Sequence, residues 1–482
     1  MTELSEKTRK FWVLALASVA SCMVALDALV VTTALSAIRL DLGCSIEELE
    51  WTVNAYNLSF AVLLLTGTAL GDRFGRRRMF GYGIGLFAGA SVTCALASSV
   101  GWLIAARALQ GAGAALVVPL AMALLSAAFP REERGRALGL FSGATGVVLI
   151  AGPLVGGAIA QGLAWQWIFW INLPIAIVVI PLVVRRIDES FGPSIALDIP
   201  GLALVTGSAL GLVWGFMRGN SAGWSSLEVV VALGAGLVLA VAFVGWELRA
   251  RGPMVPMRFF RSYAFTSGIV SSFFFYASMY GVLFFLPQFL QTAQGHGPFG
   301  AGLRLLPWTA TLFVVAPVAG NLVNRVGERP LVVAGLLLQA VGMTWIGLIV
   351  TPTLAYVQLV APLILAGAGV SMAMPAAQNA VLSSVTGSEI GKASGTFNML
   401  RYLGGVFGIA VLVAVFAQTG NVRSPQAFSV GFASAIGAAA ALSLVAAIAG
   451  LWVPSRGAKA PASAEACGGP RETRSGSAMS RC

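Results

Sequence analysis

Two charged residues stand inside long apolar stretches of this 482-residue sequence. Asp27 lies near the middle of the run 12–38 and is the only acid well inside such a run, and Arg107 lies in the run 102–125. Charges at membrane depth are costly and usually face a cavity or a partner. Burial favours the neutral form of a carboxyl group, so Asp27 could carry a proton across; alternatively, it only anchors a neighbouring helix. A guanidinium keeps its charge, so Arg107 must face water, an acid or a bound molecule.

The elements that position these residues must be membrane helices. Hydrophobic residues make up 57% of the chain and charged residues 10%, with a mean hydropathy of +0.85, whereas about a quarter of the residues of a soluble domain are charged. A spanning helix needs about 20 apolar residues. Fourteen runs meet that length: 12–38, 51–70, 80–99, 102–125, 137–160, 167–184, 199–217, 227–247, 264–290, 301–323, 331–350, 355–383, 394–417 and 428–453. We therefore expect an all-α polytopic membrane protein with 14 transmembrane helices.

The loop from Thr68 to Arg78, between the second and third runs, is the most basic in the chain. Short Arg-rich loops lie on the cytoplasmic side, and most other loop Lys and Arg residues fall on that same side of the fourteen-span plan. We expect a multi-pass protein of the cell membrane with both termini in the cytoplasm and no removable signal peptide. Orientation therefore accounts for the net charge of +11, and no nucleic-acid partner is expected.

An internal repeat divides the chain. Three pairs of segments match in the same order, two at an offset of 256 residues (389 − 133) and one at 252 (325 − 73): Glu133–Phe141 with Glu389–Phe397, Leu109–Gly113 with Leu365–Gly369, and Arg73–Gly75 with Arg325–Gly327. The pattern predicts two six-helix bundles separated by two inserted helices. Two such halves with a site between them near the bilayer midplane form a transporter architecture.

The repeat predicts five regions. They are an N-terminal cytoplasmic tail, the first bundle, two inserted helices with their loops, the second bundle and a disordered cytoplasmic tail, at 1–10, 11–187, 188–262, 263–454 and 455–482.

The two halves differ in the residues that could do chemistry. The position matching Arg107 is Leu363, and the region matching Asp27, around Met279, has no acid. We therefore expect the first half to handle protons and the second to supply mainly apolar contacts. Candidate substrate-cavity residues are Asn54, Tyr56, Tyr276, Tyr280 and Phe284. Ordinary helix packing explains any single one of these aromatic residues equally well.

Several motifs resemble those of a known family. Leu70–Arg77 resembles the loop 2–3 signature of the major facilitator superfamily, Arg107–Gly113 its fourth-helix motif, and Gly152–Gly157 the fifth-helix motif associated with antiporters. The span count, Leu26-Asp27 and the segment Trp167–Pro174 are similar to the EmrB/QacA-like drug:proton antiporters with fourteen spans. Two positions depart from the pattern. Thr68 stands where the loop signature usually opens with Gly, and Ser36 where the first-helix motif usually has Pro.

The resemblance implies roles for these residues. Arg107 would assist the movement of the proton carried by Asp27. A gate locking the two halves on the cytoplasmic side would consist of Asp72, Arg73, Gly75, Arg76 and Arg77. A helix that favours exchange over leak would carry Gly152, Pro153, Gly156 and Gly157.

The function expected from these observations is export of hydrophobic or amphipathic drugs or antibiotics in exchange for protons by alternating access. The partners would be a small substrate, protons and the lipid bilayer. We expect no enzyme activity, cofactor or metal, since the chain has one His and five Cys without metal-binding spacing. Two alternatives stay open: export of a dedicated metabolite, or a non-transporting membrane sensor or partner subunit.

Overall fold

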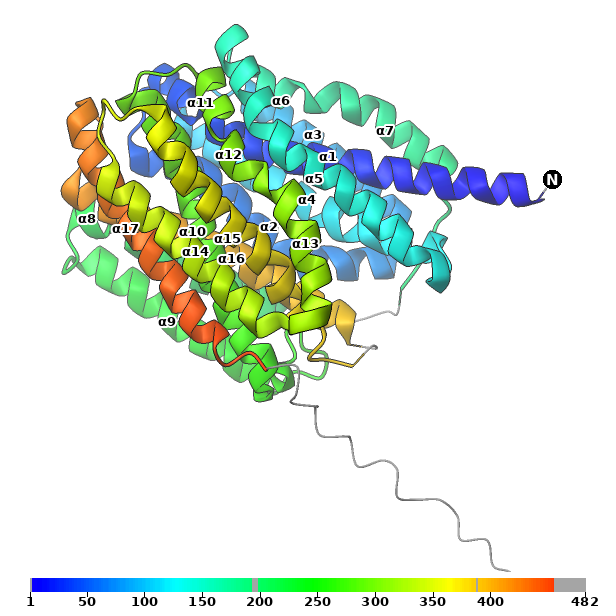
Figure 1. The fold of residues 1–482 in the computed structure, drawn as a ribbon. Helices are drawn as coiled ribbons and strands as arrows, with labels where there is room; N and C mark the ends of the chain where they lie inside the picture. The colour runs from blue at the N-terminus through cyan, green and yellow to red at the C-terminus, as the bar shows by residue number, and fades with distance from the viewer. Residues whose placement is uncertain (1, 193–197, 387–388, 455–482) are drawn as a thin grey trace, which may run out of the picture.

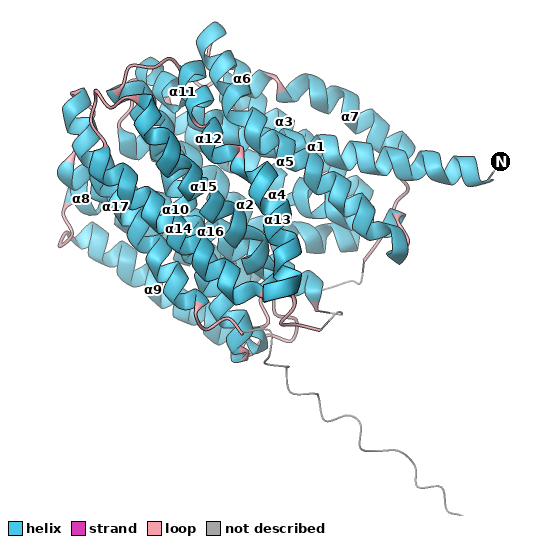
Figure 2. Ribbon diagram, in the orientation of Figure 1, coloured by secondary structure: helices cyan, strands magenta, loops and turns pink. Residues whose placement is uncertain are grey.

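A computed structural model describes residues 2–192, 198–386 and 389–454, which form a bundle of helices without a strand (Figures 1 and 2). The prediction of an all-α fold is confirmed. The predicted tail 455–482 lies outside the described residues. The first half contains α1 Thr2–Leu42, α2 Ile46–Phe74, α3 Arg76–Ala95, α4 Val100–Ala128, α5 Arg131–Gly162, α6 Trp167–Trp170 and α7 Asn172–Arg186. The inserted pair is α8 Ile199–Ala222 and α9 Leu227–Glu247.

The second half follows a short 3₁₀ turn, η1 Met257–Arg261. It contains α10 Tyr263–Gln288, a π-helical turn η2 Phe289–Ala293, α11 Pro298–Arg304, α12 Leu306–Thr309, α13 Thr311–Val326, α14 Glu328–Ile349, α15 Tyr356–Leu382, α16 Ile390–Thr419 and α17 Pro425–Gly450. Thirteen stretches in the described chain are long and apolar enough to cross a membrane. The fourteenth predicted span is α3, which falls short of that criterion because it begins with three arginines.

Some predicted helix boundaries differ from the structure. α1 already begins at Thr2, so the segment predicted as an N-terminal tail continues the first helix. The predicted span 167–184 is divided into α6 and α7, and the span 301–323 into α11, α12 and α13. Single-turn interruptions of this kind leave the apolar pattern unchanged, so hydropathy alone does not reveal them.

The internal repeat is visible in the backbone. Gly75 (φ 103°) joins α2 to α3, and Gly327 (φ 85°), its counterpart, joins α13 to α14. A positive φ of this kind is open to glycine at little cost. Matching glycines also allow matching close contacts: Gly111 lies against the α2 backbone at Tyr56, and Gly367 lies against the α12 backbone at Trp308.

The inserted helices lie at the edge of the bundle. α8 packs on α9, and α8 also contacts α2 of the first half and α16 of the second (Figure 1). Close approach of the pair is possible because Gly211 of α8 and Gly236 of α9 face each other. The two halves themselves meet where α2 runs along α16 and where α5 meets α11.

Candidate functional site

Asp27 and Arg107 meet in the interior of the first half. Nη1 of Arg107 lies 2.5 Å from Oδ2 of Asp27, and the two side chains are 1% and 0% exposed. The other carboxylate oxygen accepts hydrogen bonds from Nε2 of Gln110 at 2.7 Å and from Nδ2 of Asn172 at 3.0 Å. The group that Arg107 faces is therefore an acid, and the Asp27 carboxylate is also bonded to two neighbouring helices.

A second layer of polar groups holds this ion pair. Oγ of Ser91 accepts from Gln110 at 2.8 Å and from Asn172 at 3.1 Å, while Nε of Arg107 donates to the carbonyl of Thr52 at 3.1 Å. Arg107 also donates to Oε1 of Gln110 at 2.6 Å. The network thus joins α1, α2, α3, α4 and α7, and its single negative charge balances its single positive charge.

Sequence reasoning singled out Asp27 and Arg107 but not the residues that orient them. Gln110 follows Arg107 by three positions, so both lie on one face of α4, and Asn172 begins α7 just after the break that follows α6. Each is an amide inside an apolar run, which is a signal that could have found them. Ser91 is the one serine of the Gly-rich helix α3, and only the fold brings it to the site.

The ion pair gives the site its chemistry. Protonation of Asp27 would remove the negative charge and leave the buried Arg107 guanidinium with carbonyl oxygens and the ring of Tyr56, whose centroid is 4.2 Å away. Removing one partner of a buried ion pair typically costs about 3–5 kcal/mol. The contact between α1 and α4 at this depth therefore depends on the charge of the Asp27 carboxylate; a role for Asp27 in carrying a proton stays a prediction.

The glycines of the predicted antiporter helix lie at helix crossings. Gly152 and Gly156 of α5 face α1 at Leu29 and Val30, and Gly157 faces the α11 backbone at Pro298. Pro153 lies in the same contact, since its carbonyl faces Gly302 of α11. This part of α5 therefore joins the first half to the second.

Two hydrogen bonds reinforce this junction between the halves. Oε1 of Gln161 accepts from the backbone N–H of Phe299 at 3.1 Å, and Nε2 of Gln291 donates to the carbonyl of Thr33 at 2.9 Å. The junction lies at the end of α5 that is remote from the Arg-rich loop. α5 has no comparably extensive contact with α13 in the described chain.

The Arg-rich loop is held within the first half. Nε of Arg76 donates to Asp72 at 2.8 Å, and the backbone N–H of Arg77 donates to Glu189, just after α7, at 2.8 Å. Gly75 lies against the Glu189 carboxylate, and the guanidinium of Arg73 lies over the ring of its neighbour, Phe74. These contacts fix the loop to the end of α7. The cross-half lock stays a prediction.

The predicted cavity residues fall into different places. Tyr276 and Tyr280 of α10 lie together, with ring centroids 6.4 Å apart. Tyr56 lies under Arg107, and Phe60 one turn later contacts Tyr402 of α16 at 4.4 Å. The other two candidates lie elsewhere: Asn54 is bonded to Glu50, and Phe284 packs on Phe285.

The second half also holds an ionisable group inside a membrane helix, which the sequence analysis did not single out. Arg401 lies inside the apolar helix α16 of the second half, with its guanidinium 4.6 Å from the ring centroid of Tyr276 and 5.1 Å from that of Tyr402. The comparison of matching positions missed it because neither Asp27 nor Arg107 corresponds to it. A second acid was also missed. Glu50 is fully buried in α2, one residue before the predicted span began.

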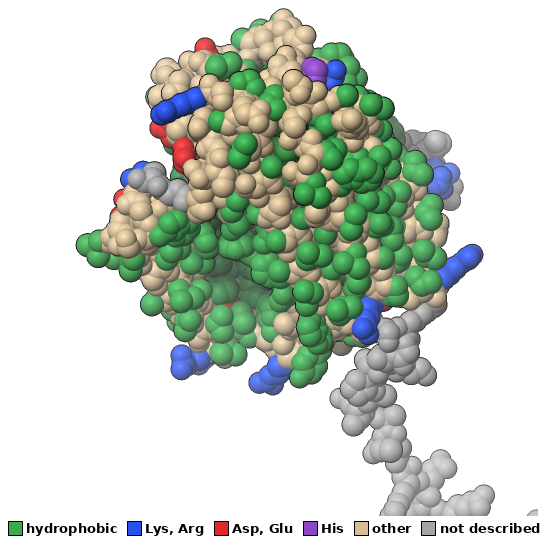
Figure 3. Space-filling model, turned by 60° about the vertical axis from the view of Figure 1, so that its left-hand side comes forward, with side chains coloured by type: hydrophobic (Ala, Val, Ile, Leu, Met, Phe, Trp, Pro, Cys, Tyr) green, Lys and Arg blue, Asp and Glu red, His purple; other side chains and the backbone are tan. Residues whose placement is uncertain are grey.

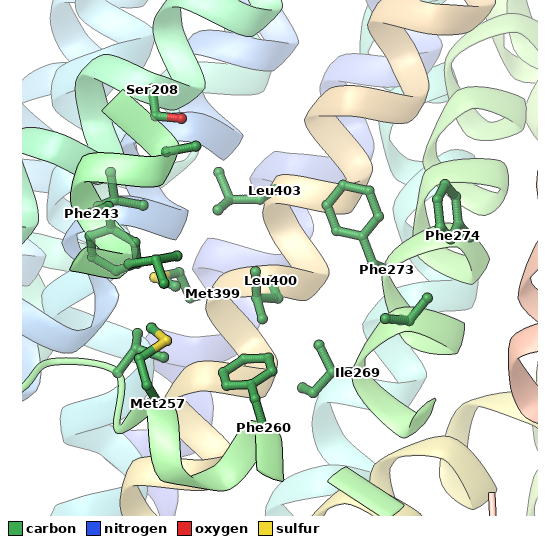
Figure 4. A pocket seen from close by; sticks show the side chains of 15 residues that line it. Ser208, Phe243, Met257, Phe260, Ile269, Phe273, Phe274, Met399, Leu400 and Leu403 are labelled. Carbon is green, nitrogen blue, oxygen red and sulfur yellow. The ribbon is translucent and has the colours of Figure 1, made fainter. Parts of the chain in front are cut away.

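A cavity of 520 Å³ lies between the inserted pair and the second half. Its lining is apolar apart from Ser208, and Leu400 and Leu403 of α16 lie between Phe243 of α9 and Phe273 of α10 (Figure 4). The face turned forward in Figure 3 has a hollow that is bordered by hydrophobic side chains. None of the predicted substrate-cavity residues lines this space.

Two helical halves, an inserted helix pair and a buried ion pair between facing helices define a membrane transporter class. The family comparison agrees, because the model of the Major Facilitator Superfamily matches residues 17–408 and, in an overlapping second match, 268–479. The chain belongs to the major facilitator superfamily.

Curated relatives include exporters and resistance proteins. The chain is 34% identical to the multidrug resistance protein Stp of Mycobacterium tuberculosis, covering 82% of this chain and 74% of that protein. It is 34% identical to the tetracenomycin C resistance and export protein of Streptomyces glaucescens, covering 83% and 75%. It is 36% identical to the cephamycin export protein CmcT of Amycolatopsis lactamdurans, covering 86% of each chain.

Solved structures share the fold at low identity. An auto-inhibited peptide transporter of the POT family aligns with a TM-score of 0.68 at 18% identity, covering 94% of this chain and 99% of that chain. The xylose transporter XylE of E. coli, in a partially occluded inward-open conformation, aligns with a TM-score of 0.63 at 16% identity, covering 94% and 99%.

Proposed function

We propose that the protein exports hydrophobic or amphipathic drugs or antibiotics across the cell membrane in exchange for protons. The observation that carries the proposal is the buried Asp27–Arg107 pair, in which one carboxylate of α1 accepts hydrogen bonds from three side chains on two other helices, α4 and α7. The relatives named for multidrug resistance and antibiotic export support the cargo class. Both termini lie in the cytoplasm, as the loop charges indicate.

In the proposed cycle, the charge state of Asp27 sets which side of the protein is open. With the Asp27 carboxylate charged, the pair with Arg107 holds α1 and α4 together, and cargo binds from the cytoplasm. Opening of the α5–α11 junction exposes the site to the outside, where a proton neutralises Asp27 and cargo leaves. Release of that proton to the cytoplasm restores the pair. A ligand shifts such an equilibrium only by its differential affinity for the two states, and the ion pair supplies that difference for the proton.

The test is transport by the purified protein in liposomes. Ethidium, a fluorescent amphipathic cation, is expected to move against its gradient when a pH gradient is imposed, and to stop when an ionophore removes that gradient. Asp27→Asn keeps the size and hydrogen-bonding capacity of the side chain but removes its charge. This variant is expected to abolish the proton-driven movement of ethidium. Proton-driven transport that survives in Asp27→Asn would refute the assigned role.

A second candidate is an exporter dedicated to one compound. Several relatives are named for single antibiotics, such as the cephamycin export protein and the tetracenomycin C resistance and export protein. Growth inhibition of a deletion strain by a panel of chemically unrelated compounds separates the two. Sensitivity to many members of the panel supports the multidrug function, and sensitivity to one scaffold alone supports the dedicated exporter.

A further inference from the structure

Arg401 differs from Arg107 because it lacks an acidic partner. The Arg107 guanidinium is paired with Asp27, whereas no acidic side chain in the described part of the chain lies within ion-pair distance of Arg401. Its Nε atom is buried without a hydrogen-bond partner. The side chain itself is only partly buried, so part of the guanidinium is open to a bound molecule.

A second unpaired polar group lies beside it. The Tyr276 side chain is fully buried, at 0% exposed, and its hydroxyl has no hydrogen-bond partner in the structure. The Arg401 guanidinium lies over the same tyrosine ring, at 4.6 Å from its centroid. A buried hydroxyl and a guanidinium whose Nε has no partner thus occur side by side on α10 and α16.

Aromatic rings surround this pair of donors. Tyr280 lies 6.4 Å from Tyr276 and 6.2 Å from Tyr402, and Phe397 lies 6.4 Å from Tyr276, measured between ring centroids. Cation–π contacts compensate part of the cost of placing a guanidinium in apolar surroundings. They do not neutralise its charge, and an unpaired charge in apolar surroundings remains unfavourable. An anion at this position would complete the site.

We propose that Arg401 and the Tyr276 hydroxyl form an anion-binding subsite for an acidic group, such as a carboxylate, carried by a hydrophobic aromatic cargo. The guanidinium and the hydroxyl donate hydrogen bonds to the acid, and the tyrosine rings pack against the aromatic frame. This inference rests on the proposed export function and names amphipathic acids as one class among the amphipathic compounds that the protein exports.

A short series of aromatic rings connects this subsite with the Asp27–Arg107 pair. Tyr402, beside Arg401, contacts Phe60 of the first half at 4.4 Å; Phe60 lies 6.2 Å from Tyr56, whose ring is 4.2 Å from the Arg107 guanidinium. Cargo bound at Arg401 would therefore act, through these ring contacts, on the residues that pack against the Asp27–Arg107 pair. This contact gives the acid and the proton a physical route to influence each other.

The test compares a carboxylate with its neutral ester on the same frame. Binding of 1-pyrenebutyrate and of its methyl ester to the full-length protein in detergent is measured by energy transfer from tryptophan to pyrene. Hydrogen bonds to charged groups are worth about 1.5–3 kcal/mol, so the acid is expected to bind roughly 10- to 100-fold more tightly than the ester. Arg401→Gln is expected to remove this preference, and Arg401→Lys to retain part of it.

Two further variants make the result decisive. Tyr276→Phe removes a single oxygen atom and is expected to lower the preference several-fold, and it decides the matter should Arg401→Gln fail to fold. Arg423→Gln, in an exposed loop, is the matched control and should keep the full preference. Equal affinity for acid and ester in the wild type, or a preference that survives in both Arg401→Gln and Tyr276→Phe, would overturn the proposal.

The same probes separate this inference from the proposed function. If the ester is still exported when a pH gradient is imposed while the acid shows no preferential binding, the exporter stands and only the anion subsite is lost. If neither probe nor ethidium is exported by the reconstituted wild type, the proposed function itself fails.

Discussion

The Asp27 carboxylate has donors on both oxygens: Arg107 on one, and Gln110 with Asn172 on the other. This arrangement makes the carboxylate a structural anchor, and the proton-binding role proposed for it is compatible with that. A residue that only anchored helices would be replaceable by asparagine, which offers similar hydrogen bonds. A residue that also binds a proton would not be.

Asn172→Ala tests the support of this carboxylate. The change removes the hydrogen bonds to Asp27 and Ser91, each worth about 1–3 kcal/mol when a charged or buried group is left unpaired. Proton-driven ethidium transport in liposomes is expected to fall by roughly tenfold. Asn421→Ala, in an exposed loop, is the control and should transport at the wild-type rate; an unimpaired Asn172→Ala would show that the carboxylate needs no such support.

How much of the site follows from sequence depends on the type of residue. Asp27 and Arg107 stand out because charge is rare in apolar runs. Gln110 and Asn172 are less costly there and stand out less. Arg401 was as visible as Arg107, but a search for matching positions in the second half passed over it. Ser91 and the carbonyl of Thr52 become part of the site only because α2, α3 and α4 cross at that depth.

At the level of helices, glycine sets how closely elements approach. Gly157 of α5 faces the backbone of α11, whereas Gly146, three turns earlier on the same helix, faces open space. A side chain larger than a hydrogen atom at position 157 would push α5 away from α11 and so separate the two halves. The helix motif that resemblance links to exchange is thus also part of the contact that closes the side remote from the Arg-rich loop.

Gly157→Ala is expected to impair closure of this junction, because a Cβ atom there would collide with the backbone at Pro298. Ethidium transport should drop by at least tenfold, while Gly146→Ala, with room for its Cβ, should remain close to the wild type. Both variants are measured in the same liposome assay with matched protein content. Comparable activity of the two variants would show that the α5–α11 contact does not limit the cycle.

Gly75→Ala probes the joint between α2 and α3. The backbone there has φ 103°, which alanine adopts only with strain of about 1–3 kcal/mol, and the Glu189 carboxylate would have to move to admit a methyl group. The melting temperature in detergent is expected to fall by several degrees. Gly81→Ala, in α3 with free space around it, should not lower it, and equal melting temperatures would contradict the strain argument.

At the scale of the whole molecule, the two halves are joined on one side at α5–α11 and along α2–α16. The repeat, the inserted pair and the all-helical class could be predicted because each leaves a long pattern in the sequence. The helix breaks between α6 and α7 and within 301–323 could not be predicted. They depend on which neighbouring groups form hydrogen bonds with the backbone N–H and C=O groups that a break releases. The side on which the halves touch is likewise a property of packing.

Cross-linking tests whether that junction must open. In a cysteine-free background, Gln161→Cys with Phe299→Cys places two thiols across the α5–α11 junction, at positions already linked by a hydrogen bond. Oxidation is expected to stop ethidium transport, and reduction to restore it. Arg218→Cys with Glu228→Cys joins the inserted helices at an existing ion pair and should leave transport intact. Transport that continues across an oxidised Gln161–Phe299 link would show that this contact stays closed throughout the cycle.

The central claim is that one proton and the cargo compete through Asp27, and proton release tests it most directly. Purified protein in weakly buffered solution with a pH indicator receives a saturating pulse of ethidium. The wild type is expected to release up to about one proton per molecule, because cargo favours the state in which Asp27 is charged and paired with Arg107. Asp27→Asn, at the same occupancy by ethidium, should release none. Equal release by both proteins would contradict the account.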